Sequence, residues 1–419
     1  MHQTPTRLSP LRPFAGAFLL TALLGACVHG GPPAPDAPAV RTKGAQPAAP
    51  TLVRGNTEFA LALYRELGAT SGDLFFSPQN ISTAMAMTVL GATGQTRGEI
   101  AAALRFPFAD HRLHEGFGEL TGDTVEEERD LVFLQANRLW LQGGFDFRAE
   151  FQQSAATHYR AEAGLLDFQR KPEDSRAAIN HWVAEKTRRK IEELIPKGVV
   201  TPDTRLVLTA AAYFKAIWQN PFAKEATQDA PFHAEDGSIS TVAMMHQKEN
   251  FPYGEKDDTQ ILSMPYAGGK FDMIVLLPKR GAFGEFERSL DADWLEAALK
   301  SLALHRVVLR FPKFEQRTSA LLKEHFQRLG MKLPFTKNAD FSGFSTQAPL
   351  QIADIAHEAF VSVDEKGSEA AAATAVIMRL TSLRPRPPTE VVFTADRPFI
   401  YLIRDRRHGG IVFMGRRER

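Results

Sequence analysis

The stretch from Asp364 to Pro388 most limits what this chain can fold into, because it is long, has no apolar stripe and separates two apolar segments. Residues 351–363 before it end in an apolar strand, and residues 391–393 and 399–403 after it have the composition of core strands. Connections longer than about 12–15 residues are uncommon inside a compact domain and are usually functional or disordered. The fold must therefore carry a long connection between two buried strands.

The first half of this connection suits either a helix or a strand. Ser368 is followed by Glu369 and four alanines, which favours a helix locally, but such a helix has no apolar stripe to dock against a core. In a strand, side chains alternate between two faces. One face then carries Ser368, Ala370, Ala372 and Thr374, and the other carries Glu369, Ala371, Ala373 and Ala375. The small residues of the first face would let the strand slide over an existing core without clashes.

The sequence Glu-Lys-Gly-Ser-Glu-Ala-Ala-Ala-Ala-Thr, from Glu365 to Thr374, resembles the hinge of the reactive-centre loop of inhibitory serpins. The resemblance implies that a loop over about residues 365–390 is exposed as bait for a protease and, once cut, inserts as an extra strand into a large central sheet A. The hinge residues that it implies are Glu365, Gly367, Ser368, Glu369, Ala370, Ala371, Ala372, Ala373 and Thr374.

Further segments resemble serpin sequence blocks in the same order along the chain. Residues 74–82 contain Phe-Ser-Pro, with Pro78 suited to the first turn of a helix, and residues 205–222 form a continuous apolar run suited to a central strand. The series covers nearly all of residues 53–419. It implies a single α+β domain with the serpin fold, comprising three β-sheets, about eight to nine helices and an exposed loop.

The resemblance also assigns residues to two regions that control opening of the sheet. Ser77, Asn80, Asn180 and His357 fall in the shutter, where His357 is expected to hydrogen-bond Asn180 and the region around Ser77. Trp218 falls at the breach, where the loop first enters the sheet. A lone histidine between apolar residues is more often a satisfied core histidine than a metal ligand or a catalyst. The resemblance implies a further role for His357, as part of a switch rather than as a catalyst.

Three features concern how the sheet opens. The family usually has Ser at the position of Asn80, so this chain keeps a polar side chain there. The family usually has Asn at the position of Ala210, so here a polar side chain is lost. Phe147, Phe151, Ala155 and Tyr159 recur at helical spacing. The resemblance implies that this helix lies across the central sheet and gates it.

The usual family spacing from Glu365 places the specificity residue at Thr381 and the reactive bond between Thr381 and Ser382. A small side chain at this position suits an elastase-like or subtilisin-like protease. Arg379 and Leu380 remain alternatives, for trypsin-like and chymotrypsin-like proteases respectively. The stretch after Ser382 looks longer than is common in the family, so the reactive bond stays open among these positions.

The first 27 residues have the pattern of an export signal, with arginines before an apolar run, residues 14–24, that is too short to span a membrane. Leu-Gly-Ala-Cys ending at Cys27 resembles the lipobox of bacterial lipoproteins, which implies cleavage before Cys27 and lipidation of its sulfur. Cys27 is the only cysteine of the chain. Residues 28–52 are rich in Pro, Ala and Gly and are expected to form a flexible tether to a domain at 53–419.

The composition excludes several functions. The formal net charge is +1 with both signs interspersed, so the chain has no nucleic-acid footprint. Gly-x-Ser-x-Gly, His-Glu-x-x-His, the phosphate-binding loop and a cysteine pair for zinc are all absent from the sequence. The sequence therefore predicts no enzyme, no catalytic residues, no cofactor and no metal site.

These expectations favour a monomeric, lipid-anchored inhibitor of serine, or else cysteine, endopeptidases, exported to the bacterial outer membrane on its periplasmic or outer side, or to the medium. The membrane contact would be only the lipid on Cys27. The alternative is a serpin-fold binding protein without inhibition, whose hinge tends to hold bulky, charged or Pro residues; residues 370–374 have none. A surface hydrolase or substrate-binding lipoprotein of another fold is disfavoured by the missing catalytic motifs.

Overall fold

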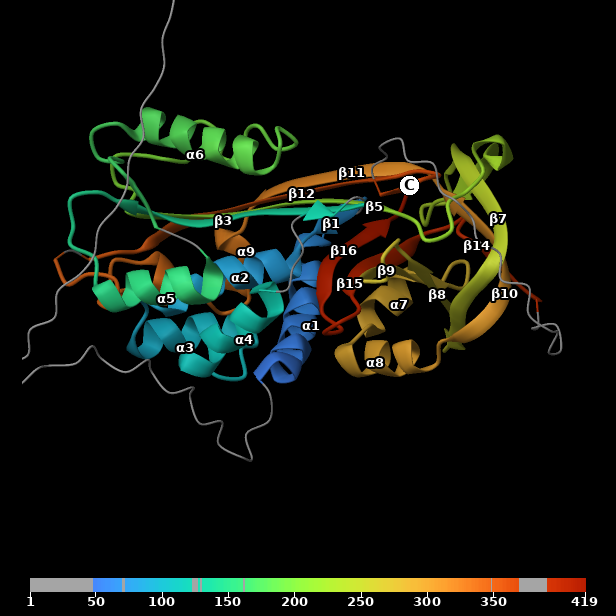
Figure 1. Cartoon of the computed structure of the whole chain (residues 1–419), viewed down its shortest axis with the longest axis horizontal. Helices are drawn as coiled ribbons and strands as arrows, with labels where there is room; N and C mark the ends of the chain where they lie inside the picture. Colours follow the sequence, from blue (N-terminus) through green and yellow to red (C-terminus); the bar gives the residue numbers. More distant parts are fainter. Residues whose placement is uncertain are drawn as a thin grey trace, which may run out of the picture. The chain divides into compact units, whose positions relative to one another are not determined.

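The computed structural model describes residues 48–69, 72–122, 127–128, 130–160, 163–347, 349–368 and 390–419. The export signal, Cys27, the hinge from Glu369 to Thr374 and the predicted reactive bond, with its alternatives from Arg379 on, lie outside the described residues. Within them the chain forms nine α-helices and two hydrogen-bonded β-sheets (Figure 1). The predicted α+β class is confirmed.

The helices follow from their caps and apolar spacing. They are α1 (Ala48–Leu67), α2 (Pro78–Val89), α3 (Gly94–Ala103), α4 (His111–Gly122), α5 (Ala149–Tyr159), α6 (Pro172–Lys186), α7 (Phe283–Ser289), α8 (Ala292–Lys300) and α9 (Lys323–Arg328). Ser77 caps α2, since its hydroxyl accepts the Asn80 N–H at 3.3 Å, and Pro78 occupies the first turn without an N–H to satisfy. This cap fixes where α2 begins beneath the sheet.

The central sheet has seven strands in the order β11, β12, β13, β5, β3 and β2, with β4 also on β3. They are β11 (Phe314–Leu321), β12 (Ile352–Val363), β13 (Gly367–Ser368), β5 (Leu206–Ile217), β3 (Leu131–Gln142), β2 (Glu127–Glu128) and β4 (Gly164–Leu166). The pair β12 and β5 is parallel, whereas β5 pairs antiparallel with β3 and β12 pairs antiparallel with β11. The central sheet is therefore mixed, with its one long parallel seam between β5 and β12.

The second sheet has nine strands in the order β1, β16, β15, β9, β8, β7, β10 and β14, with β6 also on β7. They are β1 (Leu74–Phe76), β16 (Ile411–Arg417), β15 (Phe399–Asp405), β9 (Phe271–Pro278), β8 (Thr259–Pro265), β7 (Ile239–Lys256), β10 (Ala303–Pro312), β14 (Glu390–Thr394) and β6 (Gln228–His233). The 18-residue β7 pairs with β10 and β6 along one part and with β8 along the other. It thus joins the second and third sheets that we predicted into one ladder.

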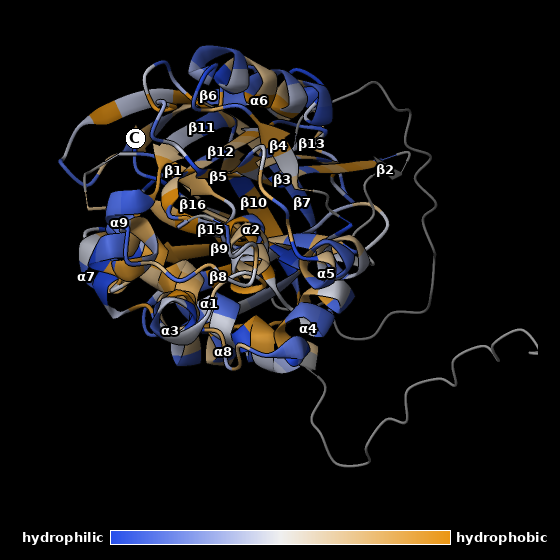
Figure 2. Cartoon of the chain, turned by 90° about the vertical axis from the view of Figure 1, so that its left-hand side faces the viewer, coloured by the Kyte–Doolittle hydropathy of each residue, from blue (hydrophilic) through white to orange (hydrophobic). Residues whose placement is uncertain are grey.

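One large apolar cluster lies between the two sheets. Strands of both sheets alternate, and their inward residues include Phe133, Phe214 and Phe413, which are almost fully buried in one cluster. Figure 2 shows apolar residues concentrated on the strands in the middle of the domain and mostly polar residues on α6. The core thus fixes which face of β5 and β12 points inward.

Helix α6 covers the outer face of the central sheet, and α1 and α2 lie on the other side of that sheet (Figure 1). Ile179 and Val183 of α6 are fully buried in a cluster with Val207 and Ala211 of β5. The helix that we predicted to gate the sheet, α5, is not there. Its Phe151 instead packs on Phe344 with ring centroids 4.6 Å apart, in the layer of α2 and α4. That prediction was wrong because helical spacing shows that α5 has an apolar face but not which partner covers it.

The domain begins earlier than the tether boundary that we predicted at residue 52. Helix α1 starts at Ala48, and Leu52 is fully buried. Leu52 lies seven residues before Phe59, so both fall on one helical face, and Phe59 stacks on Phe326 with centroids 5.9 Å apart. The Pro- and Ala-rich composition hid a helix whose first apolar residue belongs to the core.

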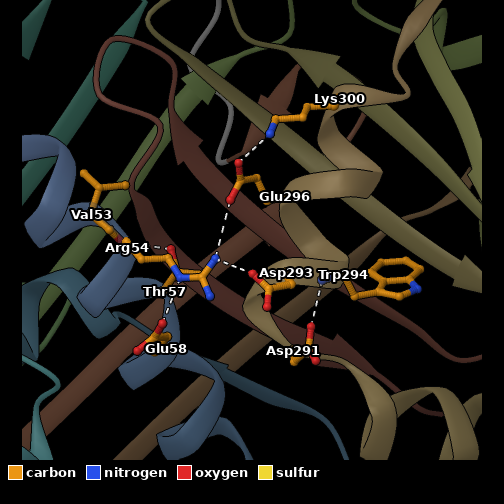
Figure 3. A network of polar contacts seen from close by, with 9 residues as sticks. All are labelled: Val53, Arg54, Thr57, Glu58, Asp291, Asp293, Trp294, Glu296 and Lys300. Atoms are coloured by element: carbon orange, nitrogen blue, oxygen red, sulfur yellow. Dashed lines mark hydrogen bonds and ion pairs between the residues drawn. The ribbon is translucent and has the colours of Figure 1, made fainter.

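A polar network joins this first part of α1 to α8 (Figure 3). The Arg54 guanidinium lies 2.8 Å from Glu58 on its own helix and 2.8 Å from Asp293, with Glu296 at 3.4 Å. These side chains are partly exposed, so each pair contributes little, about 0–1 kcal/mol. Because these ion pairs are weak, burial of Leu52 is the main reason that the helix starts before residue 53.

Candidate functional site

The seam between β5 and β12 is the candidate site, because the chain leaving β12 turns back into it. β13 pairs antiparallel with both strands: Gly367 lies opposite Ile217, and Ser368 lies opposite Ala216 on one side and Val363 on the other. The turn is closed by Asp364, whose carboxylate accepts the N–H groups of Lys366 and Gly367 at 2.8 and 3.2 Å. Two residues of the predicted hinge therefore already form a strand between β5 and β12.

Gly367 allows this entry because the two backbones approach closely. A Cβ atom at this position would lie 2.0 Å from the Ala216 carbonyl oxygen and 2.7 Å from the Ile217 Cα. Both obstacles are backbone atoms of β5, which cannot move aside without breaking the sheet. Only glycine fits at the first position of β13.

Ser368 is fully buried, and its hydroxyl lies 2.7 Å from the Tyr266 hydroxyl. The Tyr266 ring stacks on Trp218, with centroids 4.5 Å apart and planes 11° from parallel. Trp218 in turn donates its indole N–H to the Asp364 carbonyl at 3.0 Å and its backbone N–H to Lys366 at 2.8 Å. Burial raises the pKa of Tyr266 above its ordinary value, so its hydroxyl stays protonated at neutral pH. Trp218 and Tyr266 thus hold the start of the loop at the end of the seam where β5 and β12 finish.

Glu365 fastens the turn to the second sheet and its neighbours. Its carboxylate oxygens accept the Lys313 ammonium at 2.8 Å and the Thr227 hydroxyl at 2.8 Å, and its carbonyl accepts the Phe222 N–H at 2.8 Å. Although burial favours the neutral acid, the hydrogen bonds from Lys313 and Thr227 keep the pKa of Glu365 below its ordinary value. The hinge therefore starts from an anchored, ionised residue.

His357 joins three elements at the middle of the seam. It is fully buried, its Nδ1 lies 2.5 Å from the Ala210 carbonyl oxygen of β5, and its Nε2 accepts the Ser77 N–H at 3.2 Å. The Ser77 hydroxyl donates to the Val412 carbonyl at 2.7 Å. Burial lowers the pKa of His357 to about 4, so the ring is neutral at pH 7 and donates from Nδ1. One imidazole thus ties β12 to β5 and to the start of α2.

Asn180 does not belong to this group. It lies on α6, where its side chain donates to the Ile195 carbonyl at 3.0 Å and accepts the Ile195 N–H at 2.8 Å. The predicted hydrogen bond between His357 and Asn180 is therefore wrong, because the central sheet separates α6 from the inward-facing imidazole. The partner of His357 is the backbone of Ala210, the position at which the family usually has an asparagine side chain.

Asn80 lies in the first turn of α2, and its backbone N–H donates to the Ser77 hydroxyl at 3.3 Å. Three residues of the site were not identified from the sequence: Tyr266, Lys313 and Thr227. They contact the hinge from segments far away along the chain, so no local sequence signal could have found them. Ala210 was singled out from the sequence for the polar side chain that it lacks, whereas its contact with His357 is made by its carbonyl.

Lowering the pH is expected to reduce the free energy of unfolding of the uncut chain, because His357 is buried in its neutral form. Its pKa of about 4 in the folded chain lies below the ordinary 6.5, so the unfolded state takes up a proton first, and stability falls as the pH drops from 6.5 toward 4. The loss is on the order of 3 kcal/mol. Unfolding midpoints of the wild type and of His357→Gln between pH 7.5 and 4.5 measure it, and the variant should lose less. Burial also lowers the pKa of His114 to about 4, but this residue is present in both proteins. If the unfolding midpoint falls equally steeply with pH in the wild type and in His357→Gln, the assignment to His357 is contradicted.

Within the described ranges, no cluster of three or more His, Cys, Asp or Glu side chains is placed to hold a metal ion. None of the helices described is both long and apolar enough to cross a membrane.

Comparisons with known proteins give the same fold. The family described as "Serpin (serine protease inhibitor)" matches residues 54–418. A serpin-like protein of Thermococcus kodakarensis is 39% identical over 367 residues, covering 87% of this chain and 85% of its own. The leukocyte elastase inhibitor of Equus caballus is 39% identical over 377 residues, covering 87% and 98%. A crystal structure of maspin superposes with a TM-score of 0.81 at 26% identity, covering 89% of this chain and 100% of maspin.

Proposed function

Because the chain belongs to the serpin family, we propose that it inhibits serine endopeptidases as a suicide substrate whose cut loop inserts into the central sheet. The observation that carries the proposal is β13, since Gly367 and Ser368 already occupy the seam between β5 and β12 in the uncut chain. A strand that has begun to insert needs no new nucleus. Cleavage would only free the remainder of the loop to follow.

The chemistry that starts the process belongs to the protease. Its serine oxygen attacks the carbonyl carbon at the reactive bond, and the proton passes to its histidine. The C–N bond breaks, the new amine at Ser382 leaves with that proton, and Thr381 stays attached as an ester. Insertion of the loop before water reaches the ester would carry the protease along the sheet and distort its active site.

The energy for insertion comes from the seam. β5 and β12 pair from Leu206 to Tyr213 and from Ile352 to Phe360, and these hydrogen bonds must part to admit a strand. An antiparallel strand between them would pair with both neighbours along its length, so the number of ladder hydrogen bonds rises. The resting form is then held by a kinetic barrier. Part of that barrier is the link from His357 to Ala210.

The target class rests on the reactive bond. Thr381 suits an elastase-like protease, and one relative of this chain is named a leukocyte elastase inhibitor. Arg379 and Leu380 keep trypsin-like and chymotrypsin-like serine proteases as alternatives, and cysteine endopeptidases form an acyl-enzyme by the same route. A lipid on Cys27 would anchor the inhibitor at the bacterial outer membrane. The tether between them would end where helix α1 begins, at Ala48.

Incubating the purified chain with elastase, subtilisin, trypsin and chymotrypsin tests the proposal. We expect a covalent adduct that survives denaturation on a gel, with a released fragment that begins at Ser382 by mass spectrometry. Nicking the loop should also raise the unfolding midpoint strongly. Cleavage by all four proteases with neither an adduct nor this rise would overturn the proposal in favour of a binding protein with the serpin fold.

A further inference from the structure

Strands β7, β10 and β14 have an outer face that remains accessible in the described part of the chain. Side chains alternate along each strand, and Val307, Leu309 and Phe393 point inward, where they are fully buried in the cluster between the two sheets. The residues between them therefore point outward. On β10 these outward residues are Leu304, Arg306, Val308 and Arg310, all of them exposed or half-buried.

The outer face carries exposed apolar side chains. Of the four large apolar side chains that the described residues leave exposed, two lie here: Leu304 is 66% exposed and Val392 is 59% exposed. Val392 of β14 lies opposite Val308 of β10, so their side chains adjoin each other. A single exposed apolar residue needs no explanation, whereas adjoining ones point to contact with a partner.

The charges on this face are not balanced. The Lys248 ammonium lies 2.6 Å from the Glu390 carboxylate, and the Arg306 guanidinium lies 3.3 Å from the Glu249 carboxylate. Arg310 is exposed, and its side chain has no ion pair or hydrogen bond among the described residues. The face therefore keeps one uncompensated positive charge, next to the outward valines.

Both ends of the predicted bait loop border this face. The loop starts at Glu365, whose carboxylate binds the ammonium of Lys313, three residues after Arg310. It ends at Glu390, the first residue of β14, which lies opposite Arg306. Figure 1 shows β7, β10 and β14 together at one end of the domain. A protease that holds the loop must therefore lie close to this face.

This position makes even a weak contact effective. Once a protease holds the loop, the face meets it intramolecularly, at an effective concentration that reaches the mM range for short connections. A positive charge there also attracts an acidic surface during the encounter and raises the association rate. Cations beside apolar residues would suit a membrane surface too, but the place between the two ends of the loop favours the protease.

We propose that the outer face of β7, β10 and β14 is a second docking surface for the target protease, in which Arg310 binds an acidic rim of the enzyme and Val308 and Val392 pack beside it. This inference rests on the proposed function, since it needs a protease at the loop. It assigns to Arg310 a role in specificity: proteases with acidic residues around the active-site cleft react faster than basic ones of the same cleavage preference.

The rate of adduct formation tests this role, with the full chain and the fastest-reacting of elastase, subtilisin, trypsin and chymotrypsin. At about 0.01 M ionic strength, where charges act over about 30 Å, Arg310→Glu should react about tenfold more slowly than the wild type. At about 1 M, where they act over about 3 Å, the two rates should converge. The moles of inhibitor consumed per mole of protease inactivated should not change, because Arg310 is exposed and far from the seam strands in the sheet order.

Arg170→Glu is the matched control, because it makes the same change of net charge elsewhere. Arg170 is exposed between β4 and α6, and β4 pairs with β3 at the end of the central sheet that lies away from β13. This variant should keep the wild-type rate at both ionic strengths. Arg310→Ala, with a smaller loss of rate, replaces Arg310→Glu should the charge reversal fail to fold.

The outcomes separate this inference from the proposed function. If none of the four proteases forms an adduct, the proposed function falls and this inference falls with it. If adducts form but Arg310→Glu reacts as fast as the wild type at low ionic strength, inhibition stands and the docking surface is overturned. Equal rates together with binding of the wild type, but not of Arg310→Glu, to phosphatidylglycerol vesicles would assign the face to a membrane instead.

Discussion

Replacing Ala372 with glutamate is expected to turn this chain from an inhibitor into a substrate of the same protease. If the inserted loop continues the register of Gly367 and Ser368, Ala372 would come to lie opposite Ala212 and Ala359, which are fully buried in the cluster between the two sheets. A carboxylate there loses its water with no partner, at a cost of several kcal/mol. A penalty of about 4 kcal/mol slows insertion roughly 1000-fold. Water then hydrolyses the acyl-enzyme first.

Ala371→Glu is the matched control, because it places the same charge one residue earlier. In the same continued register the inserted Ala371 would lie opposite Tyr213 and Phe360, whose side chains point to the other face of the sheet from Ala212 and Ala359. Cations lie over both rings there, Lys190 at 5.6 Å from the Tyr213 centroid and Arg317 at 4.7 Å from the Phe360 centroid. A carboxylate on this face would meet the positive charge of Lys190 and Arg317, so Ala371→Glu should still inhibit.

The two variants are compared by the moles of inhibitor consumed per mole of protease inactivated, and by the unfolding midpoint before and after nicking. Ala372→Glu should be cleaved with almost no adduct and gain little on nicking, whereas Ala371→Glu should resemble the wild type. Equal loss in both variants would show that the hinge tolerates no charge on either face. Equal inhibition by both would mean that the register of β13 does not continue past Ser368.

Most of the fold was predictable because its signals are local or lie in order along the chain. The Phe-Ser-Pro segment predicted the cap at Ser77 and the start of α2, and the apolar run after residue 205 predicted β5. The position of Trp218 at the loop entrance also followed from the order of the blocks. These features need only a short window of sequence.

The errors concern partners that only the folded chain brings together. Helix α5 and helix α6 both carry a modest apolar face, and only tertiary packing decides that α6 covers the sheet. Asn180 satisfies the backbone of Ile195 beside it, which its sequence neighbourhood does not show. Spacing therefore indicates that a residue is buried, but not on which side of a sheet.

The uncut chain holds the start of the loop and the middle of the seam by two separate sets of contacts. At the end of the seam where β5 and β12 finish, Ser368 and Glu365 are fully hydrogen-bonded, so the start of the loop is secure. At the middle of the seam, His357 joins β12 to the Ala210 carbonyl of β5. Beneath it lies the side-chain amide of Asn80, which has no partner among the described residues. Such a division lets insertion begin readily and stop until cleavage lengthens the free strand.

Replacing Gly367 with alanine is expected to expel the start of the loop from the seam. The new Cβ would lie 2.0 Å from the Ala216 carbonyl oxygen, closer than any real contact. Relieving this clash costs about 1–3 kcal/mol in a well-packed site, which slows a step that needs the pairing roughly 5- to 150-fold. The cut loop of Gly367→Ala should insert slowly, and more inhibitor should be consumed per protease inactivated.

Gly98→Ala is the matched control, because Gly98 is exposed in α3 and a Cβ there meets nothing within 4 Å. Alanine should even stabilise that helix, by up to about 1 kcal/mol. Hydrogen exchange of the Ser368 amide reports the pairing of β13 with β5: exchange should rise in Gly367→Ala and stay slow in Gly98→Ala. If this amide stays protected in Gly367→Ala and its inhibition is unchanged, then β5 yields to the methyl group and the close approach at Gly367 does not control entry of the loop.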